Sequence, residues 1–126
     1  MREIKFRGYS SGLHTWVYGD LQTPIKNNNL PFIRQLDKDE WFSVEEASIG
    51  QYTGFKDKNG VEIYEGDIIR SDDGIDYEII FDADNGWIAV YEEGDERIFF
   101  NLSHIRDKCY IEVIGNIYEE RLKENK

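Results

Sequence analysis

The 126-residue sequence predicts a mainly β protein: a small antiparallel SH3-like barrel at about 49–116, an N-terminal β-hairpin region and little helix. Aromatic residues make up 14% of the chain, and such side chains suit pleated sheets, where they pack across strands. Asn59-Gly60, Asp73-Gly74, Asn85-Gly86 and Glu93-Gly94 each lie between β-rich runs, and their glycines are 14, 12 and 8 residues apart. This spacing is typical of a β-meander. A short sheet with many strands tends to curl into a barrel, which removes its exposed edges.

The N-terminal region, residues 1–48, begins with a predicted hairpin. Residues 2–9 and 13–21 are expected to be short strands, because Ser10-Ser11-Gly12 between them is a turn signal. Residues 22–31 contain two prolines and three consecutive asparagines, a composition that predicts an exposed loop.

The segment that follows has apolar residues too irregularly spaced for an assignment. Near its end, Ser43 and Glu46 fit a capping box, with Ser43 as the N-cap. We therefore expect at most one helical turn before the next strand.

The barrel region is expected to hold seven strands. They are predicted at 49–55, 61–64, 67–71, 75–82, 86–92, 96–101 and 109–115. In the fourth of these strands, Ile75, Tyr77, Ile79 and Phe81 share one face, so one side of the strand is expected to be buried. The polar tail, 117–126, is expected to be a frayed helical turn or a disordered end of the single domain 1–126.

Charge and composition limit the classes of function. The net charge is −11, with +3 on residues 1–35 and −14 on the remainder. Cys109 is the only cysteine, which excludes an internal disulfide and a zinc site built on several cysteines. No apolar run is long enough for a signal peptide or a membrane span, so we expect a cytoplasmic protein without a membrane partner.

Three segments carry a resemblance to a known family. They are GQYTGFKDKNGVEIYEGDIIR at 50–70, IKFRGY at 4–9 and IEVIGNIYEE at 111–120. In their order along the chain they resemble the YopX family of bacterial prophages and phages. The resemblance implies a β-rich fold, a phage or prophage origin and action inside a bacterial host. It implies no activity, substrate or catalytic residue, because the family offers none to transfer.

Candidate catalytic and metal-binding groups have simpler explanations. The run Asp82-Ala83-Asp84-Asn85-Gly86 resembles the start of a calcium loop, but its glycine comes one residue early and the later bidentate Glu is missing. The carboxylates of residues 72–96 could hold Mg²⁺ or act as an acid–base pair, although turns are ordinarily acidic. His14 or His104 could activate Cys109, but a buried strand thiol is the expected role of that cysteine. We therefore expect a protein that is not an enzyme, with no metal and no cofactor.

The leading functional hypothesis is an accessory protein that binds another protein. Large aromatic side chains can anchor such an interface. The candidates are Trp16, Trp41, Trp87, Tyr52 and Tyr64. Self-association is a further expectation, because sheet edges pair readily and a basic N-terminal arm complements an acidic barrel.

Two alternatives involve nucleic acid. Small barrels bind single strands through aromatics set in a basic groove, and the basic residues of the N-terminal region would be the contacts here. They are Arg2, Lys5, Arg7, Lys26 and Arg34. The opposite alternative is an acidic protein whose carboxylates imitate phosphates and inhibit a host enzyme.

Overall fold

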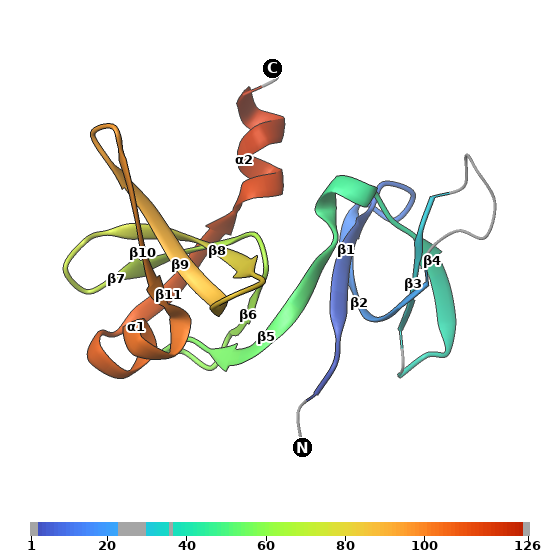
Figure 1. Ribbon diagram of the computed structural model, residues 1–126. Coiled ribbons are helices and arrows are strands. Elements are labelled where there is room, and N and C mark those ends of the chain that lie inside the picture. The colour runs from blue at the N-terminus through green and yellow to red at the C-terminus, as the bar shows by residue number, and fades with distance from the viewer. Residues whose placement is uncertain (1–2, 23–29, 36, 125–126) are drawn as a thin grey trace. The chain divides into compact units, whose positions relative to one another are not determined.

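The computed structural model describes residues 3–22, 30–35 and 37–124 (Figure 1). The elements run in the order β1 (Phe6–Ser10), β2 (Thr15–Gln22), β3 (Phe32–Gln35), β4 (Glu40–Ser43), a 3₁₀ helix η1 (Glu46–Ser48), β5 (Gly50–Lys56), β6 (Glu62–Tyr64), β7 (Asp67–Ser71), β8 (Asp76–Asp82), β9 (Gly86–Glu93), β10 (Glu96–Asn101), α1 (Leu102–Lys108), β11 (Ile111–Asn116) and α2 (Ile117–Glu124). The chain is mainly β, as predicted.

The chain divides into two compact units, residues 1–52 and 53–126, and the single domain 1–126 stays a prediction. Each unit has its own cluster of buried apolar side chains, and this explains the division.

The first unit is an antiparallel sheet in the order β4-β3-β2-β1, with the start of β5 next to β1. Val17, Ile33 and Val44 form its core, and Phe6, Leu21, Phe42 and Ile49 pack around them. The strands contribute these residues from alternate positions, so one face of the sheet is apolar.

Glycine is required at one position of this sheet. A Cβ atom on Gly19 would overlap the carbonyl oxygen of Arg34 on the neighbouring strand β3. The close backbone approach of β2 and β3 therefore depends on the missing side chain.

In the first unit one segment had no predicted structure, and one expectation was wrong. The irregular segment contains two strands, β3 and β4, each only four residues long, too short to show a clear alternation. The capping box does not form: Ser43 ends β4, and η1 follows Glu45 without any side-chain cap. Most of the predicted loop 22–31 lies outside the described residues.

The second unit contains an antiparallel sheet in the order β10-β9-β8-β7-β11. Its core is formed by Ile63, Ile69, Tyr77, Ile79, Trp87, Ala89, Leu102, Ile105 and Ile111. Tyr77 and Ile79 are buried on the predicted face of β8, whereas Phe81 at its end is half exposed and meets the Trp87 ring edge to face at 5.1 Å. The four turns at the Asn-Gly, Asp-Gly and Glu-Gly pairs occur where they were predicted.

The signature segment at 50–70 forms β5, β6 and β7. Thr53 Oγ donates to the Ile63 carbonyl (2.8 Å), and the fully buried Asp67 carboxylate accepts from the Tyr64 N–H (2.7 Å). Gly66, with φ of 90°, makes the turn, donates to the Ile79 carbonyl and accepts from the Ile117 N–H, both at 2.8 Å. These contacts hold the β6–β7 turn against β8 and α2, so the segment is explained by its structural role.

Three expectations for the second unit need correction. Among the described residues β10 and β11 are the unpaired ends of the sheet order, so no closed barrel is seen, and SH3-like architecture stays a prediction. Residues 102–108 form the helix α1, which we did not predict, and Cys109 ends this helix half-buried instead of lying in a strand. The tail forms the helix α2 at Ile117–Glu124, where we expected at most a frayed turn.

Candidate functional site

Three of the predicted interface aromatics lie in the interior. Tyr52, Tyr64 and Trp87 are buried, so the expectation that they face a partner is corrected. Their size explains the outcome, because large aromatic side chains supply much of the apolar area of small cores. Trp16 is half-buried, between Tyr9 (ring centroids 5.7 Å apart) and the guanidinium of Arg7 (4.8 Å).

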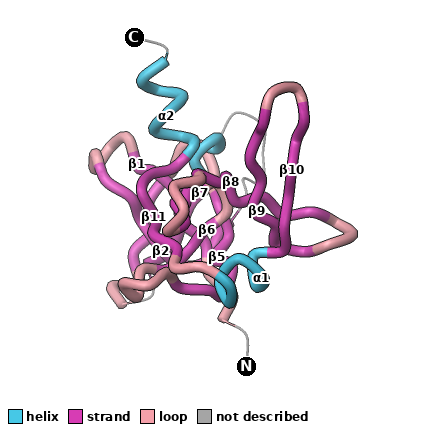
Figure 2. The backbone as a smooth tube through the Cα atoms, turned by 90° about the vertical axis from the view of Figure 1, so that its left-hand side faces the viewer, coloured by secondary structure: helices cyan, strands magenta, loops and turns pink. Residues whose placement is uncertain are grey.

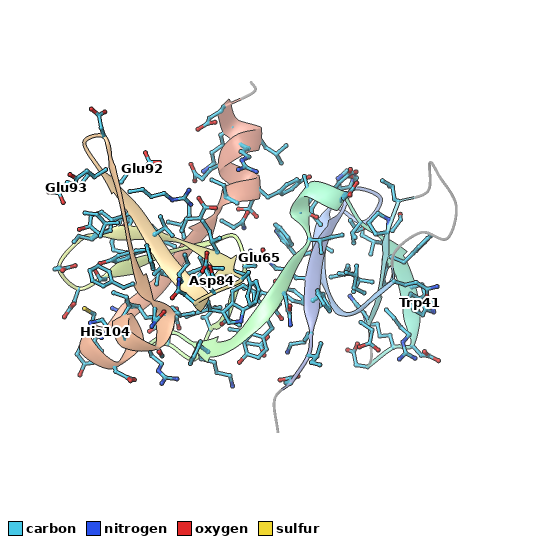
Figure 3. The ribbon with its side chains drawn as sticks, viewed as in Figure 1. Trp41, Glu65, Asp84, Glu92, Glu93 and His104 are labelled. Atoms are coloured by element: carbon cyan, nitrogen blue, oxygen red, sulfur yellow. The ribbon has the colours of Figure 1, made fainter. Side chains whose placement is uncertain are left out.

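Trp41 is the predicted aromatic that remains exposed, with 47% of its surface accessible. It lies on β4, an end strand of the first sheet (Figure 3). The guanidinium of Arg34 packs over its indole ring at 5.6 Å. Trp41 therefore stays a candidate for contact with a partner.

The basic residues proposed for nucleic acid have partners inside the chain. Lys5 lies 3.5 Å from the Glu3 carboxylate, and Arg7 is buried. Arg34 pairs with Asp20 at 2.8 Å and with Asp39 at 3.3 Å, and the Asp20 hydrogen bond is the main cause of its raised pKa. Arg2 and Lys26 lie outside the described residues. Carboxylates thus already neutralise Lys5 and Arg34, and this does not favour phosphate binding.

The carboxylates of residues 72–96 do not gather into a cation site. Arg70 holds Asp76 through two hydrogen bonds of 2.7 and 3.0 Å, which lower the pKa of that carboxyl group. The Ser71 hydroxyl donates to Asp73, and Asp82 accepts from its own turn. Among residues 3–22, 30–35 and 37–124, no group of three or more His, Cys, Asp and Glu side chains is arranged to hold a metal.

The two histidines and Cys109 play other parts. Burial, and then the charges of Asp72 and Asp73, raise the pKa of the Cys109 thiol, which lowers the fraction of reactive thiolate. His104 is exposed on α1 and stacks on Phe100, with ring centroids 5.9 Å apart. His14 is exposed in the β1–β2 turn with a positive φ of 56°. These positions offer no support for a nucleophile–base pair.

The most distinctive surface feature is the strand β10. It forms one end of the second sheet, and its hairpin with β9 stands out from the rest of that sheet in both views (Figures 1 and 2). Phe99 and Phe100 are 51% and 38% exposed, on opposite faces of this strand. An exposed, regular edge with apolar side chains is the kind of strand that pairs with another chain.

The turn of the β9–β10 hairpin determines which backbone groups of β10 point outward. Glu93 and Glu96 pair directly across the two residues Gly94 and Asp95, and Gly94 has a positive φ of 63°. In such a two-residue turn the flanking pair exchanges both hydrogen bonds, and the pairs then alternate. Ile98 and Phe100 are therefore bonded to β9, whereas Arg97, Phe99 and Asn101 direct their N–H groups away from the sheet.

These outward groups of β10 have no backbone partner among the described residues. The other end of the same sheet is protected. On β11 the Ile111 carbonyl accepts from the Lys58 N–H (3.0 Å), and the Val113 N–H donates to the Asp57 carboxylate (2.9 Å). The second unit thus covers one sheet edge and leaves the other open.

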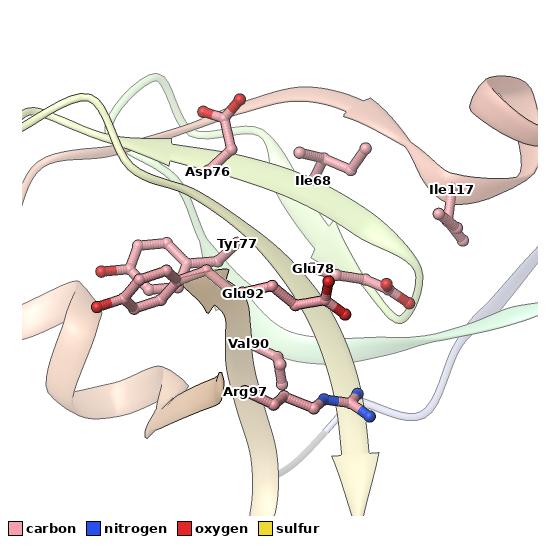
Figure 4. A pocket seen from close by; sticks show the side chains of 9 residues that line it. Ile68, Asp76, Tyr77, Glu78, Val90, Glu92, Arg97 and Ile117 are labelled. Atoms are coloured by element: carbon pink, nitrogen blue, oxygen red, sulfur yellow. The ribbon is translucent and has the colours of Figure 1, made fainter. Parts of the chain in front are cut away.

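A shallow hollow of about 250 Å³ adjoins β10 on the face that carries Arg97 (Figure 4). Ile68, Val90 and Ile117 contribute apolar surface to it. Glu78 on β8, Glu92 on β9 and Arg97 on β10 extend their charged ends toward the same side of the hollow (Figure 4). The rim beside β10 therefore mixes apolar contact with charges of both signs, as protein interfaces do.

Sequence reasoning missed Phe99 and Phe100 as functional candidates. The run ERIFFN at 96–101 predicts a strand, but periodicity cannot show that the strand lies at a sheet edge. The available signal was the adjacent pair of phenylalanines, because neighbouring residues of a strand face opposite sides and only one face can belong to the core.

Comparison with known proteins places the chain by sequence. The family model described as YopX protein matches residues 5–122. No curated protein matches the sequence significantly. In the described part of the chain, no helix has the length and apolar character needed to cross a membrane.

Proposed function

The chain belongs to the YopX family, and from that premise we propose that it is a non-enzymatic phage or prophage accessory protein that binds another protein along β10. It would act in the bacterial cytoplasm. The second unit, a meander from β7 to β10 with β11 returning beside β7, is proposed to be an opened variant of an SH3-like barrel.

The observation that supports this proposal is the open edge of β10. Extended segments of partner proteins add to such edges through backbone hydrogen bonds, while side-chain contacts on alternate positions supply specificity. Phe99 and Phe100 provide apolar contact on the two faces, and Arg97 provides a charge at the rim of the hollow. Catalytic chemistry has no comparable support among the described residues.

The experiment is affinity capture of the tagged protein from bacterial lysate, with and without nuclease, compared with Phe99→Pro. Proline removes an outward N–H and leaves the β9 ladder intact, so it is tolerated at an edge but blocks strand addition. We expect a stoichiometric protein that survives nuclease and disappears with Phe99→Pro. Tyr110→Ser, which alters an exposed aromatic (72%) outside any strand, is the control and should retain it.

Two outcomes would overturn the proposal. Capture that vanishes with nuclease would point to nucleic acid, and capture unchanged by Phe99→Pro would place binding elsewhere. If the captured protein is a nucleic-acid enzyme that loses activity in the complex, the protein acts by phosphate mimicry.

A further inference from the structure

We propose that β10 pairs with β10 of a second copy of this chain, antiparallel, about a two-fold axis that passes through Phe99. The inference rests on the proposed function, because it identifies the strand that adds to the open edge as β10 of a second copy. Its basis is the self-complementary pattern of the edge residues and the protection of the opposite edge of the sheet.

The outward backbone groups restrict the register of such a pair. In a symmetric antiparallel pairing the hydrogen-bonded pairs must be formed by Arg97, Phe99 and Asn101, since only these residues direct their N–H groups away from β9. The axis can therefore pass through one of these three residues, or through Ile98 or Phe100 between them. Centred on Phe99, each Phe99 opposes its own copy and Arg97 opposes Asn101 of the second chain. Asn101 is the N-cap of α1, so its carbonyl already accepts the first helical hydrogen bond. Each Arg97–Asn101 pair therefore forms one inter-chain backbone hydrogen bond instead of two. Together with the two bonds of the Phe99 pair, about four such bonds form.

The other centres are less favourable. A pair centred on Ile98 places Arg97 opposite Phe99 and Glu96 opposite Phe100, and a pair centred on Phe100 places Phe99 opposite Asn101. Neither gives both exposed phenylalanines an apolar partner. A pair centred on Arg97 places two guanidinium groups directly opposite each other, and like charges in that position are destabilising. A pair centred on Asn101 would run into α1, because β10 ends at that residue. The register through Phe99 is the one that gives both exposed phenylalanines an apolar partner.

The side chains agree with this register. On one face, the two half-exposed Phe99 rings meet at the axis, and on the other face Ile98 of each chain opposes Phe100 of its copy. Both pairs are apolar, and aromatic cross-strand pairs contribute to sheet pairing. The pairing covers the exposed phenylalanine surface that a single chain leaves in water.

Within the second sheet, the geometry also limits the pairing to two chains. Symmetric pairing uses the β10 edge of both copies, and the remaining edge at β11 is already occupied by Lys58 and Asp57. The acidic hairpin tips, which carry Glu93, Asp95 and Glu96, point to opposite ends of the dimer. Since each chain has a net charge of −11, long-range repulsion opposes association, and added salt should strengthen the dimer.

The first test is the molecular mass of the full chain in solution. Sedimentation equilibrium over a wide concentration range should give twice the chain mass of 14.9 kDa, with tighter association at high salt. Phe99→Pro should be monomeric with an unchanged circular dichroism spectrum, and Tyr110→Ser should remain dimeric. Phe100→Pro removes a ladder bond to β9 and should lose structure, which checks the assigned direction of the N–H groups.

The second test reads the register by cysteine cross-linking in a Cys109→Ser background, with copper–phenanthroline as the oxidant. Paired Cα atoms in an antiparallel sheet lie about 5.5 Å apart, within reach of a disulfide. Phe99→Cys alone should form a covalent dimer. Arg97→Cys and Asn101→Cys should each remain uncrosslinked alone and should crosslink when mixed.

A chain that stays monomeric at all protein and salt concentrations would overturn the inference. In that case, a protein that is captured by the unmodified chain and not by Phe99→Pro would still support the proposed function. A dimer that survives Phe99→Pro, or crosslinks Arg97→Cys to itself, would also overturn it. A dimer with the expected crosslinks would support the inference. If affinity capture then yields no other protein, the binding proposed for β10 is self-association alone.

Discussion

Asp57 offers the sharpest test of what stabilises the second unit. Its carboxylate is buried and accepts three backbone N–H groups: Asn59 (2.8 Å) and Val61 (2.9 Å) from its own turn, and Val113 (2.9 Å) from β11. One side chain therefore shapes the β5–β6 turn and also covers the outer edge of β11. Sequence analysis did not single it out, because its most distant partner is 56 residues away.

The cost of Asp57→Ala can be worked from these contacts. Hydrogen bonds to a charged group contribute about 1.5–3 kcal/mol each, so three would total roughly 4.5–9 kcal/mol. Because the three bonds share one carboxylate and the backbone relaxes, we expect a loss of about 4 kcal/mol or slightly more. This is a large part of the ~5–15 kcal/mol that stabilises a typical domain.

The assay is urea unfolding followed by the indole N–H resonance of Trp87, the only tryptophan in residues 53–126. With a slope of about 1–3 kcal/mol per molar urea, the midpoint should fall by more than about 1 M. Asp82→Ala is the matched control, since Asp82 also accepts three N–H groups, but in an exposed turn.

Water can replace the lost acceptor at Asp82, so the control should cost less than about 1 kcal/mol. The reasoning is that burial of the accepting carboxylate determines how much it contributes to the free energy of unfolding. Equal losses of this free energy in the two variants would refute it. An Asp57→Ala midpoint close to that of the unmodified chain would also refute it.

Three further predictions follow from single contacts. The pKa of Asp76 is lowered by its hydrogen bonds to Arg70, so Arg70→Gln should raise that pKa in a carboxyl NMR titration. A lowered folded pKa means that the pair stabilises the fold at pH values above the unfolded pKa and loses this effect as pH falls through the folded pKa. Because both groups are largely exposed, the effect on stability should be small. The Cys109 thiol, whose pKa is raised by burial, should react with iodoacetamide at pH 8 more slowly than free cysteine and reach the free rate in urea; equal rates in folded protein would contradict its assigned environment. Gly19→Ala forces a methyl group onto a carbonyl oxygen of β3 and should cost about 1–3 kcal/mol, seen as faster hydrogen exchange in β2 and β3. Gly12→Ala, whose methyl group would meet only the Ser10 hydroxyl at 4.0 Å, should leave exchange unchanged.

Local patterns in the sequence determined much of the fold. The Asn-Gly, Asp-Gly and Glu-Gly turns lie where the sequence predicted them, because a two-residue turn with positive φ is a local property of two or three residues. The alternation in β8 correctly predicted that Tyr77 and Ile79 are buried. Family membership could also be read from the sequence, since three ordered segments carry it.

Only the tertiary structure decided which strands lie next to each other. The sequence predicted β10 but could not show that β10 ends the sheet, whereas the pairing order does. Tyr52, Tyr64 and Trp87 were candidates for a surface and are buried, because composition cannot distinguish a core aromatic from an exposed one. The open edge at β10 and the covered edge at β11 arise from contacts between residues far apart in the chain, and local periodicity carries no information about such contacts.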